Sequence, residues 1–291
     1  MRIAIVRSPK AYLPEADAYK RYLTGRGFEA RCVESRDELQ ADETAILFRF
    51  EDQFARNLRA RRRIHEEHNL PIGWRAKARA VAMKFAPEPH GLIRLEQVAD
   101  QAPTGPQPTL VRLCGIDEAI FDTNRVSHPE FDLVYCGSLE RPGMATMLER
   151  LGRRGFTIAV YGRVPPGWPT ARLAAAGVKL FGKIARDDVP KALSNARAGL
   201  NYTPDHGPLP FQESIKTLEY VAAGLPVVAN CYPWAERFAK EHATQFLWID
   251  EKIGPADLDR LAPPDVDLTD RTWPALFDRI GLIDFLTEVS K

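Results

Sequence analysis

Short hydrophobic runs rich in β-branched residues alternate with helix-like segments from the start of the chain. In the first part, the runs predict strands at residues 2–6, 28–33, 44–50 and 90–95, and the segments between them predict helices at 15–27 and 51–68. A strand, a helix and a second strand in series form a βαβ unit, which requires a parallel sheet covered by helices. The first part therefore predicts a short α/β domain.

The alternation starts again at Phe131, where six more runs predict strands at residues 131–137, 156–162, 178–182, 198–202, 226–230 and 244–249. Helical patterns separate these runs, so the fold class is α/β with two Rossmann-like, doubly wound domains in series facing across a cleft. We place the domains at residues 1–125 and 126–270, followed by one or two helices in residues 271–291. Ligands of such sheets bind beyond the carboxyl ends of the strands.

Composition narrows the classes of partner. The 40 Lys and Arg residues balance 39 Asp and Glu residues, and the net charge of +1 gives no global attraction to nucleic acid. The most basic stretch, Arg56 to Lys84, fits either a solvated helix face or a contact with anionic lipid. No hydrophobic run approaches the roughly 18–20 residues that span a bilayer, which predicts a cytoplasmic protein. The cysteines stand singly, without metal-ligand spacing.

The stretch FQESIKTLEYVAAGLPVVAN, residues 211–230, predicts a helix followed by a strand. Its hydrophobic residues are spaced as on one face of a helix, at Ile215, Leu218, Val221 and Ala222. Gly224 stands where a helix ends, and Pro226 prevents the helix from continuing. This predicts a helix that packs on the sheet and begins at its carboxyl edge.

Lys216 and Glu219 lie three residues apart on another face of this helix. They are either an exposed ion pair, worth a few tenths of a kcal/mol, or part of a ligand site. A helix N-terminus attracts anions, and Ser214 and Lys216 would add a hydroxyl and a full charge there. Unusual loops at residues 136–143, 161–169 and 201–214 follow strands at the same edge, which favours a phosphate site.

The core of this stretch, Lys-x-x-Glu-Tyr-x-Ala-x-Gly-x-Pro-Val-Val, resembles the C-terminal half of retaining glycosyltransferases with the GT-B fold, of the family 4-like group 1. The stretches FDLVYCGSLERPG, VKLFGKIARDDVPKALSNARAGLNY and LCGIDEAIF support the resemblance by their order and spacing. The resemblance implies a first domain on the acceptor side, a second domain that binds the nucleotide sugar, and a last helix that returns to the first domain.

The resemblance also implies roles for single residues. Glu219 would accept hydrogen bonds from the donor ribose, and Lys216 would bind the donor diphosphate, with Ser214 at the helix start. Gly137 and Ser138 fall in the loop that approaches the phosphates. The segment with Gly182 and Lys183 corresponds to the stretch whose backbone meets the nucleotide base.

Three positions depart from the family pattern. Ser138 stands where relatives often carry Arg, so we expect Arg141 to supply the missing cation. Phe211 stands where many relatives carry a first glutamate, and Gln212 or Glu213 would take over its contact with the sugar. His206 lies in the long donor-side loop, where it either contacts the sugar or its phosphate or has a structural role.

These features predict a hexosyltransferase that moves a sugar from a UDP- or GDP-linked donor to a glycan or lipid-linked acceptor in surface polysaccharide synthesis. Lys216, Arg141 and the helix dipole would stabilise the leaving diphosphate without a metal or other cofactor. Retention of anomeric configuration is implied by the resemblance alone, and no base that activates the acceptor is evident. Two alternatives stay open: a nucleotide-sugar epimerase or other sugar enzyme on the same scaffold, and a non-catalytic binding module.

Overall fold

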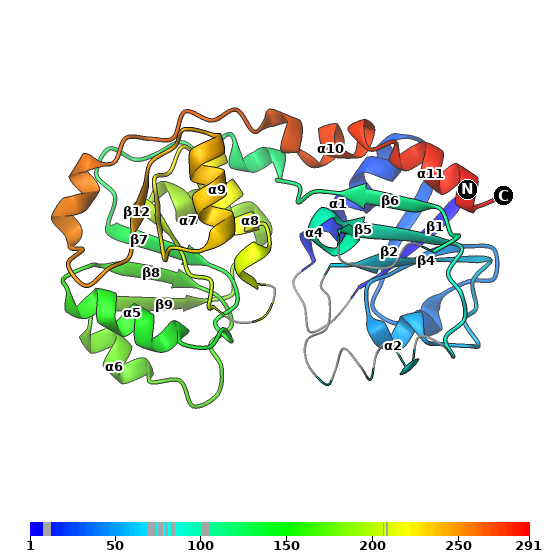
Figure 1. Cartoon of the computed structure of the whole chain (residues 1–291), viewed down its shortest axis with the longest axis horizontal. Helices are drawn as coiled ribbons and strands as arrows, with labels where there is room; N and C mark the ends of the chain where they lie inside the picture. Colours follow the sequence, from blue (N-terminus) through cyan, green and yellow to red (C-terminus); the bar gives the residue numbers. More distant parts are fainter. Residues whose placement is uncertain are drawn as a thin grey trace. The chain divides into compact units, whose positions relative to one another are not determined.

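The computed structural model describes residues 1–7, 13–68, 74, 78, 81–82, 85–100, 105–205, 207 and 209–291. It divides the chain into two compact units (Figure 1). Unit 1 comprises Met1–Gly115 and Asp270–Lys291, and unit 2 comprises Ile116–Thr269. The first division lies before the predicted boundary at residue 125, because Ile116 and Ile120 are buried and the short 3-10 helix η2 (Glu118–Ile120) packs on a helix of unit 2.

Unit 1 contains a parallel sheet of six strands in the order β2-β1-β3-β4-β5-β6. The strands are β1 (Arg2–Val6), β2 (Glu29–Val33), β3 (Thr44–Leu47), β4 (Arg62–Glu67), β5 (Gly91–Leu95) and β6 (Thr109–Arg112). The helices are α1 (Pro14–Gly25), α2 (Phe50–Gln53), α4 (Glu96–Ala99), α10 (Trp273–Arg279) and α11 (Leu282–Val289), with the 3-10 turns η1 (Arg36–Glu38) and η6 (Thr269–Arg271). The predicted two-domain α/β fold is confirmed, with more strands here than the sequence predicted.

The helix predicted at residues 51–68 is wrong. Helix α2 has only four residues, and β4 lies between β3 and β5 in the sheet. Glu66 on β4 is fully buried, and Arg112 donates a hydrogen bond of 2.9 Å from Nε to its Oε1, with His68 Nε2 also 2.9 Å from that oxygen. Burial would raise the pKa of Glu66, but Arg112 and His68 hold it below its ordinary value. Because Arg112 of β6 and the nearby His68 stabilise the charge, a polar segment forms an interior strand.

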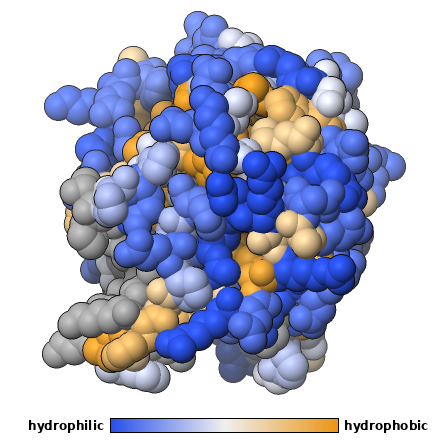
Figure 2. All heavy atoms as spheres, turned by 90° about the vertical axis from the view of Figure 1, so that its right-hand side faces the viewer, coloured by the Kyte–Doolittle hydropathy of each residue, from blue (hydrophilic) through white to orange (hydrophobic). Residues whose placement is uncertain are grey.

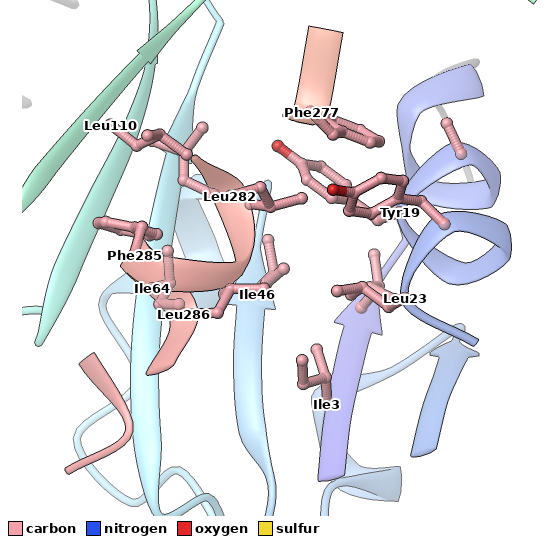
Figure 3. Close-up of a cluster of buried hydrophobic side chains, with 14 of the residues drawn as sticks. Ile3, Tyr19, Leu23, Ile46, Ile64, Leu110, Phe277, Leu282, Phe285 and Leu286 are labelled. Atoms are coloured by element: carbon pink, nitrogen blue, oxygen red, sulfur yellow. The ribbon is translucent and has the colours of Figure 1, made fainter. Parts of the chain in front are cut away.

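The core of unit 1 joins the two ends of the chain. Figure 3 shows Ile3 of β1 and Tyr19 of α1 in one hydrophobic cluster with Phe277 and Leu282 of the last two helices. The rings of Tyr19 and Phe277 stack with centroids 4.7 Å apart. Alternate residues of β1, Ala4 and Val6, face the opposite side of the sheet, as the period of a strand requires. Figure 2 shows that the surface near the two termini is largely hydrophilic, with small hydrophobic areas.

Unit 2 contains a second parallel sheet of six strands, in the order β12-β11-β10-β7-β8-β9. The strands are β7 (Phe131–Cys136), β8 (Ile158–Tyr161), β9 (Val178–Gly182), β10 (Ala196–Asn201), β11 (Val227–Ala229) and β12 (Phe246–Trp248). The helices are α5 (Met144–Arg153), α6 (Thr170–Ala175), α7 (Val189–Ser194), α8 (Ile215–Ala222) and α9 (Pro233–Glu241), with the 3-10 turns η3 (Arg186–Asp188), η4 (Leu209–Phe211) and η5 (Pro255–Arg260). All six predicted strands of this unit are confirmed.

The strand order of unit 2 reverses between β7 and β10. The chain first moves outward from β7 to β8 and β9, and then crosses to β10 on the other side of β7. The reversal makes the carboxyl edge between β7 and β10 the switch point of the sheet. This switch point is where open α/β sheets bind their ligands.

Candidate donor site

Helix α8 follows β10 and begins at this switch point. Ser214 is its N-cap, and its Oγ accepts a hydrogen bond of 3.4 Å from the backbone N–H of Thr217. The helix ends before Gly224, whose φ of 66° is left-handed, as the sequence predicted. The Ser214 oxygen thus already accepts one hydrogen bond, from the backbone of its own helix. Its contact with an anion stays a prediction.

Helix α8 is buried on more than the hydrophobic face that the sequence predicted. Leu218 and Val221 are buried as expected, but Thr217, Glu219 and Tyr220 are buried as well. Lys216 is half-buried. Lys216 and Glu219 are therefore not an exposed surface pair, and the structure excludes that alternative.

Tyr220 fixes α8 on the sheet. An added Cβ on Gly199 of β10 would lie only 2.3 Å from atoms of the Tyr220 ring, so the ring lies directly on the strand backbone. The Tyr220 hydroxyl donates to the Leu200 carbonyl at 3.2 Å and accepts from the Cys136 N–H at 3.3 Å. One ring thus ties α8 to both strands of the switch point, and it places Glu219 beside the end of β7.

Lys216 lies against the loop after β7. Its Cδ would be 3.2 Å from a Cβ on Gly137, and its Nζ is 5.7 Å from the centroid of the Tyr135 ring. Burial lowers the pKa of Lys216 to about 7, with a further contribution from the positive charge of Arg141, while Glu219 opposes the shift. In the part of the chain that the structure describes, no carboxylate forms an ion pair with the Lys216 ammonium, and Glu219 only partly offsets its charge.

The loop after β7 is held close to the sheet. The Gly137 carbonyl lies 2.2 Å from the position of a Cβ on Gly162, so only glycine fits at the end of β8. Tyr135 donates from its hydroxyl to the Ser138 carbonyl at 2.7 Å. Arg141 donates from Nη1 to the Tyr202 carbonyl at 2.8 Å and thereby joins the loops that follow β7 and β10. The structure brings Gly137, Arg141 and Lys216 together.

Glu219 faces two charged residues that the sequence analysis missed. Arg186 Nη1 in η3 lies 2.6 Å from Glu219 Oε1, and Arg186 Nε lies 3.8 Å from Asp117 Oδ2. Burial raises the pKa of Glu219, while Arg186 and Lys216 oppose the shift. Arg186 lies in the stretch KIARDD and Asp117 in the stretch GIDE, and both stretches follow strands. This position after a strand end is the sequence signal that could have indicated them as site residues.

The other residues predicted for the donor site lie at the end of β9 and in the segment before α8. Gly182 ends β9 with a left-handed φ of 78°, and Lys183 after it is exposed. Gln212 and Glu213 are half-buried between η4 and the cap of α8, next to Phe211, which is 53 % exposed. Their contacts with a base or sugar stay predictions. His206 lies outside the described residues.

Comparison with known proteins agrees with this geometry. Residues 141–259, all in unit 2, match a family model described as glycosyl transferase-like. No curated protein matches the chain in sequence.

Solved glycosyltransferases share the fold over nearly the whole chain. AviGT4 of avilamycin A biosynthesis matches with a TM-score of 0.52 and 11 % identity, covering 99 % of this chain and 96 % of its own. HepE of Anabaena, solved with UDP-glucose, matches with a TM-score of 0.56 and 13 % identity, covering 100 % and 98 %. TarM of S. aureus matches with a TM-score of 0.50 and 13 % identity, covering 86 % of this chain and 55 % of its own.

The two six-stranded units define a protein with the two-domain GT-B fold. Within this fold, residues 141–259 of unit 2 are similar in sequence to the glycosyl transferase-like family.

Proposed function

We propose that the chain transfers a sugar from a nucleoside diphosphate sugar to a glycan or lipid-linked acceptor in surface polysaccharide synthesis. The observation that carries the proposal is the half-buried Lys216, which lies against Gly137 at the switch point of unit 2 and forms no ion pair with any described residue. A donor diphosphate would supply that charge, and its binding would raise the lysine pKa back toward the ordinary value. Arg141 and the start of α8 add positive potential at the same place.

In this proposal the sugar leaves its diphosphate with the help of fixed positive charge. The bond between the anomeric carbon and the diphosphate oxygen breaks, an acceptor hydroxyl oxygen bonds to that carbon, and the hydroxyl proton passes to the departing diphosphate. Lys216 and Arg141 stabilise the negative charge that grows on the diphosphate. Glu219 binds the ribose, and Gln212 or Glu213 binds the sugar hydroxyls. Metal independence and retention of anomeric configuration belong to the proposal as well, the latter on the sequence resemblance alone.

The test is release of nucleoside diphosphate from a nucleotide sugar in the presence of a glycan acceptor. UDP-sugars come first, because HepE and TarM were solved with UDP-glucose and UDP, and GDP-sugars follow. Lys216→Ala should lower kcat by about 10²–10³-fold, as expected for loss of one transition-state contact. Lys179→Ala, an exposed lysine of the same unit, is the matched control and should retain activity.

The outcomes separate the alternatives. Conversion of the donor sugar without an acceptor would identify an epimerase, and saturable binding without turnover would identify a binding module. Binding of neither UDP nor GDP would contradict the proposal. Turnover unchanged by EDTA would support metal independence, and the anomeric proton coupling of the product reports retention or inversion.

We also propose contact of unit 1 with an anionic membrane surface at the cytoplasmic side. Three large hydrophobic residues near the basic stretch are exposed: Trp74 by 75 %, Val81 by 57 % and Phe85 by 68 %. Residues 75–77, 79–80 and 83–84 of this stretch lie outside the described residues, but their sequence adds four Lys or Arg. Among the helices that the structure describes, none has the length and hydrophobicity needed to cross a membrane.

Vesicles of phosphatidylglycerol and of phosphatidylcholine test this contact. Sedimentation with the anionic vesicles, reduced by Phe85→Ser and by high salt, would support it. Equal sedimentation with both lipids, or none with either, would contradict it.

A further inference from the structure

The contact between Glu219 and Arg186 is the best-defined charge pair of the candidate site. The two side chains are 7 % and 19 % exposed, and Arg186 Nη1 lies 2.6 Å from Glu219 Oε1. They come from different elements, since Glu219 lies in the second turn of α8 and Arg186 begins η3 after β9. Asp117, just before η2, is the second carboxylate beside Arg186, at 3.8 Å from its Nε. The guanidinium is thus held between two carboxylates of the same unit.

Four titratable groups, from α8, β7, η3 and the residue before η2, act on Glu219. Lys216 stands one turn earlier on α8, and Cys136 at the end of β7 is a thiol whose pKa burial raises to about 12. Arg186 and Asp117 are the other two. A carboxyl group buried beside a neutral thiol, with a lysine that is only partly protonated near pH 7, tends to take up a proton. Of the two cations among these groups, Lys216 and Arg186, only Arg186 stays protonated at every working pH.

We propose that Arg186 is a positioning residue for the donor ribose, which keeps the Glu219 carboxylate ionised and directed at the ribose hydroxyls. This inference rests on the proposed function and names a requirement of the donor site that the sequence resemblance does not contain. An ionised carboxylate accepts hydrogen bonds from two neighbouring hydroxyl groups, whereas a protonated one must use one oxygen as a donor. Asp117 in turn limits the directions that Arg186 can take.

The experiment compares the affinity of the full chain for UDP and for 2′,3′-dideoxy-UDP. The two ligands differ only in the hydroxyl groups that Glu219 would bind, so the ratio of their dissociation constants isolates that contact. Hydrogen bonds to charged groups predict a ratio of about tenfold or more for the wild-type protein. Because the diphosphate is the same in both ligands, protonation of Lys216 changes both dissociation constants equally and leaves their ratio unchanged.

In Arg186→Met the ratio of the two dissociation constants should fall to about three or less near pH 6.5 and rise again toward pH 8.5. The reason is that a buried carboxyl group without its cation keeps its proton to higher pH. The affinity for the dideoxy ligand should stay nearly unchanged. Arg186→Lys, which keeps the charge, should retain most of the ratio. Arg197→Met is the matched control, since Arg197 pairs with Asp132 elsewhere in unit 2.

A ratio in Arg186→Met equal to that of the wild type would overturn the inference and leave the proposed function standing. Equal loss of affinity for both ligands would also overturn it, because a merely structural arginine would act on both. Binding of neither ligand, nor of GDP, by the wild-type protein would overturn the proposed function itself. If Arg186→Met does not fold, as its thermal unfolding would show, the same ratio measured in Arg186→Gln decides: a lowered ratio supports the inference, and an unchanged one contradicts it.

Discussion

Burial changes the charge state that we expect for Lys216 near neutral pH. On an isolated helix it would pair weakly with Glu219 in solvent. In the structure it is half-buried beside Gly137, and burial and Arg141 lower its pKa to about 7. A lysine with this pKa changes its charge near neutral pH, whereas an exposed lysine stays protonated.

This pKa predicts that binding of a nucleoside diphosphate is coupled to proton uptake. Below pH 7 the free protein already carries the charge on Lys216, whereas above pH 7 the ligand must bind together with a proton. The affinity for UDP should therefore fall by up to about tenfold per pH unit above pH 7. Isothermal titration calorimetry at pH 8 in buffers of different ionisation enthalpy measures the uptake.

Lys216→Arg is the control, because a guanidinium stays protonated throughout this range. It should bind UDP with little pH dependence between pH 7 and pH 8.5. A wild-type protein that takes up no proton at pH 8 would contradict the assignment of Lys216 to the diphosphate.

At the scale of elements, the position of α8 depends on contact between the Tyr220 ring and the backbone of β10. Gly199 allows this contact, and the Tyr220 hydroxyl then bonds to the backbone of both β10 and β7. The neighbouring residues Glu219 and Lys216 take their positions from this anchor. The glycine of the strand and the tyrosine of the helix therefore act as a pair, although 21 residues separate them in the sequence.

We expect Gly199→Ala to destabilise unit 2 by about 1–3 kcal/mol, the usual cost of adding atoms to a packed interior. The added Cβ would meet the Tyr220 ring at 2.3 Å and displace α8, so the affinity for UDP should fall as well. Urea unfolding and UDP titration measure the two effects. Gly254→Ala is the control, because a Cβ there meets no atom within 4 Å. Equal stability of the two variants would show that the ring does not hold α8.

At the scale of the whole molecule, unit 1 is assembled from the two ends of the chain. Helices α10 and α11 pack on the core of β1, β3 and α1, and Phe277 lies between Tyr19 and Tyr22 with ring centroids 4.7 Å and 5.1 Å away. Each unit has its own sheet and its own hydrophobic clusters. A defect in one unit should therefore affect the stability of that unit first.

Removal of the Phe277 ring tests this separation. Phe277 is fully buried, so Phe277→Ala should destabilise unit 1 by about 3–5 kcal/mol. Hydrogen exchange followed by mass spectrometry should show faster exchange in α1 and β1–β3, with β7–β11 unchanged. The same acceleration in both units would mean that the chain unfolds as one cooperative body.

The sequence alone determined the elements whose signals are local. The six strands of unit 2 and the end of α8 before Gly224 follow from hydrophobic spacing and from the glycine and proline within a few positions. The start of α8 at the carboxyl edge of a parallel sheet followed from the same local signals together with the alternation of strands and helices along the chain.

Only the tertiary structure decided the features that depend on distant partners. Strand β4 is not apparent from the local pattern, because its buried Glu66 is stabilised by Arg112, 46 residues away. Apart from their place after strand ends, Arg186 and Asp117 gave no local signal of their pairing, since the contacts of Arg186 with Asp117 and with Glu219 exist only after η3, α8 and the segment before η2 have come together. The spacing of hydrophobic residues indicates which side of a helix or strand is buried. Which residue pairs with a buried charge depends on the tertiary fold.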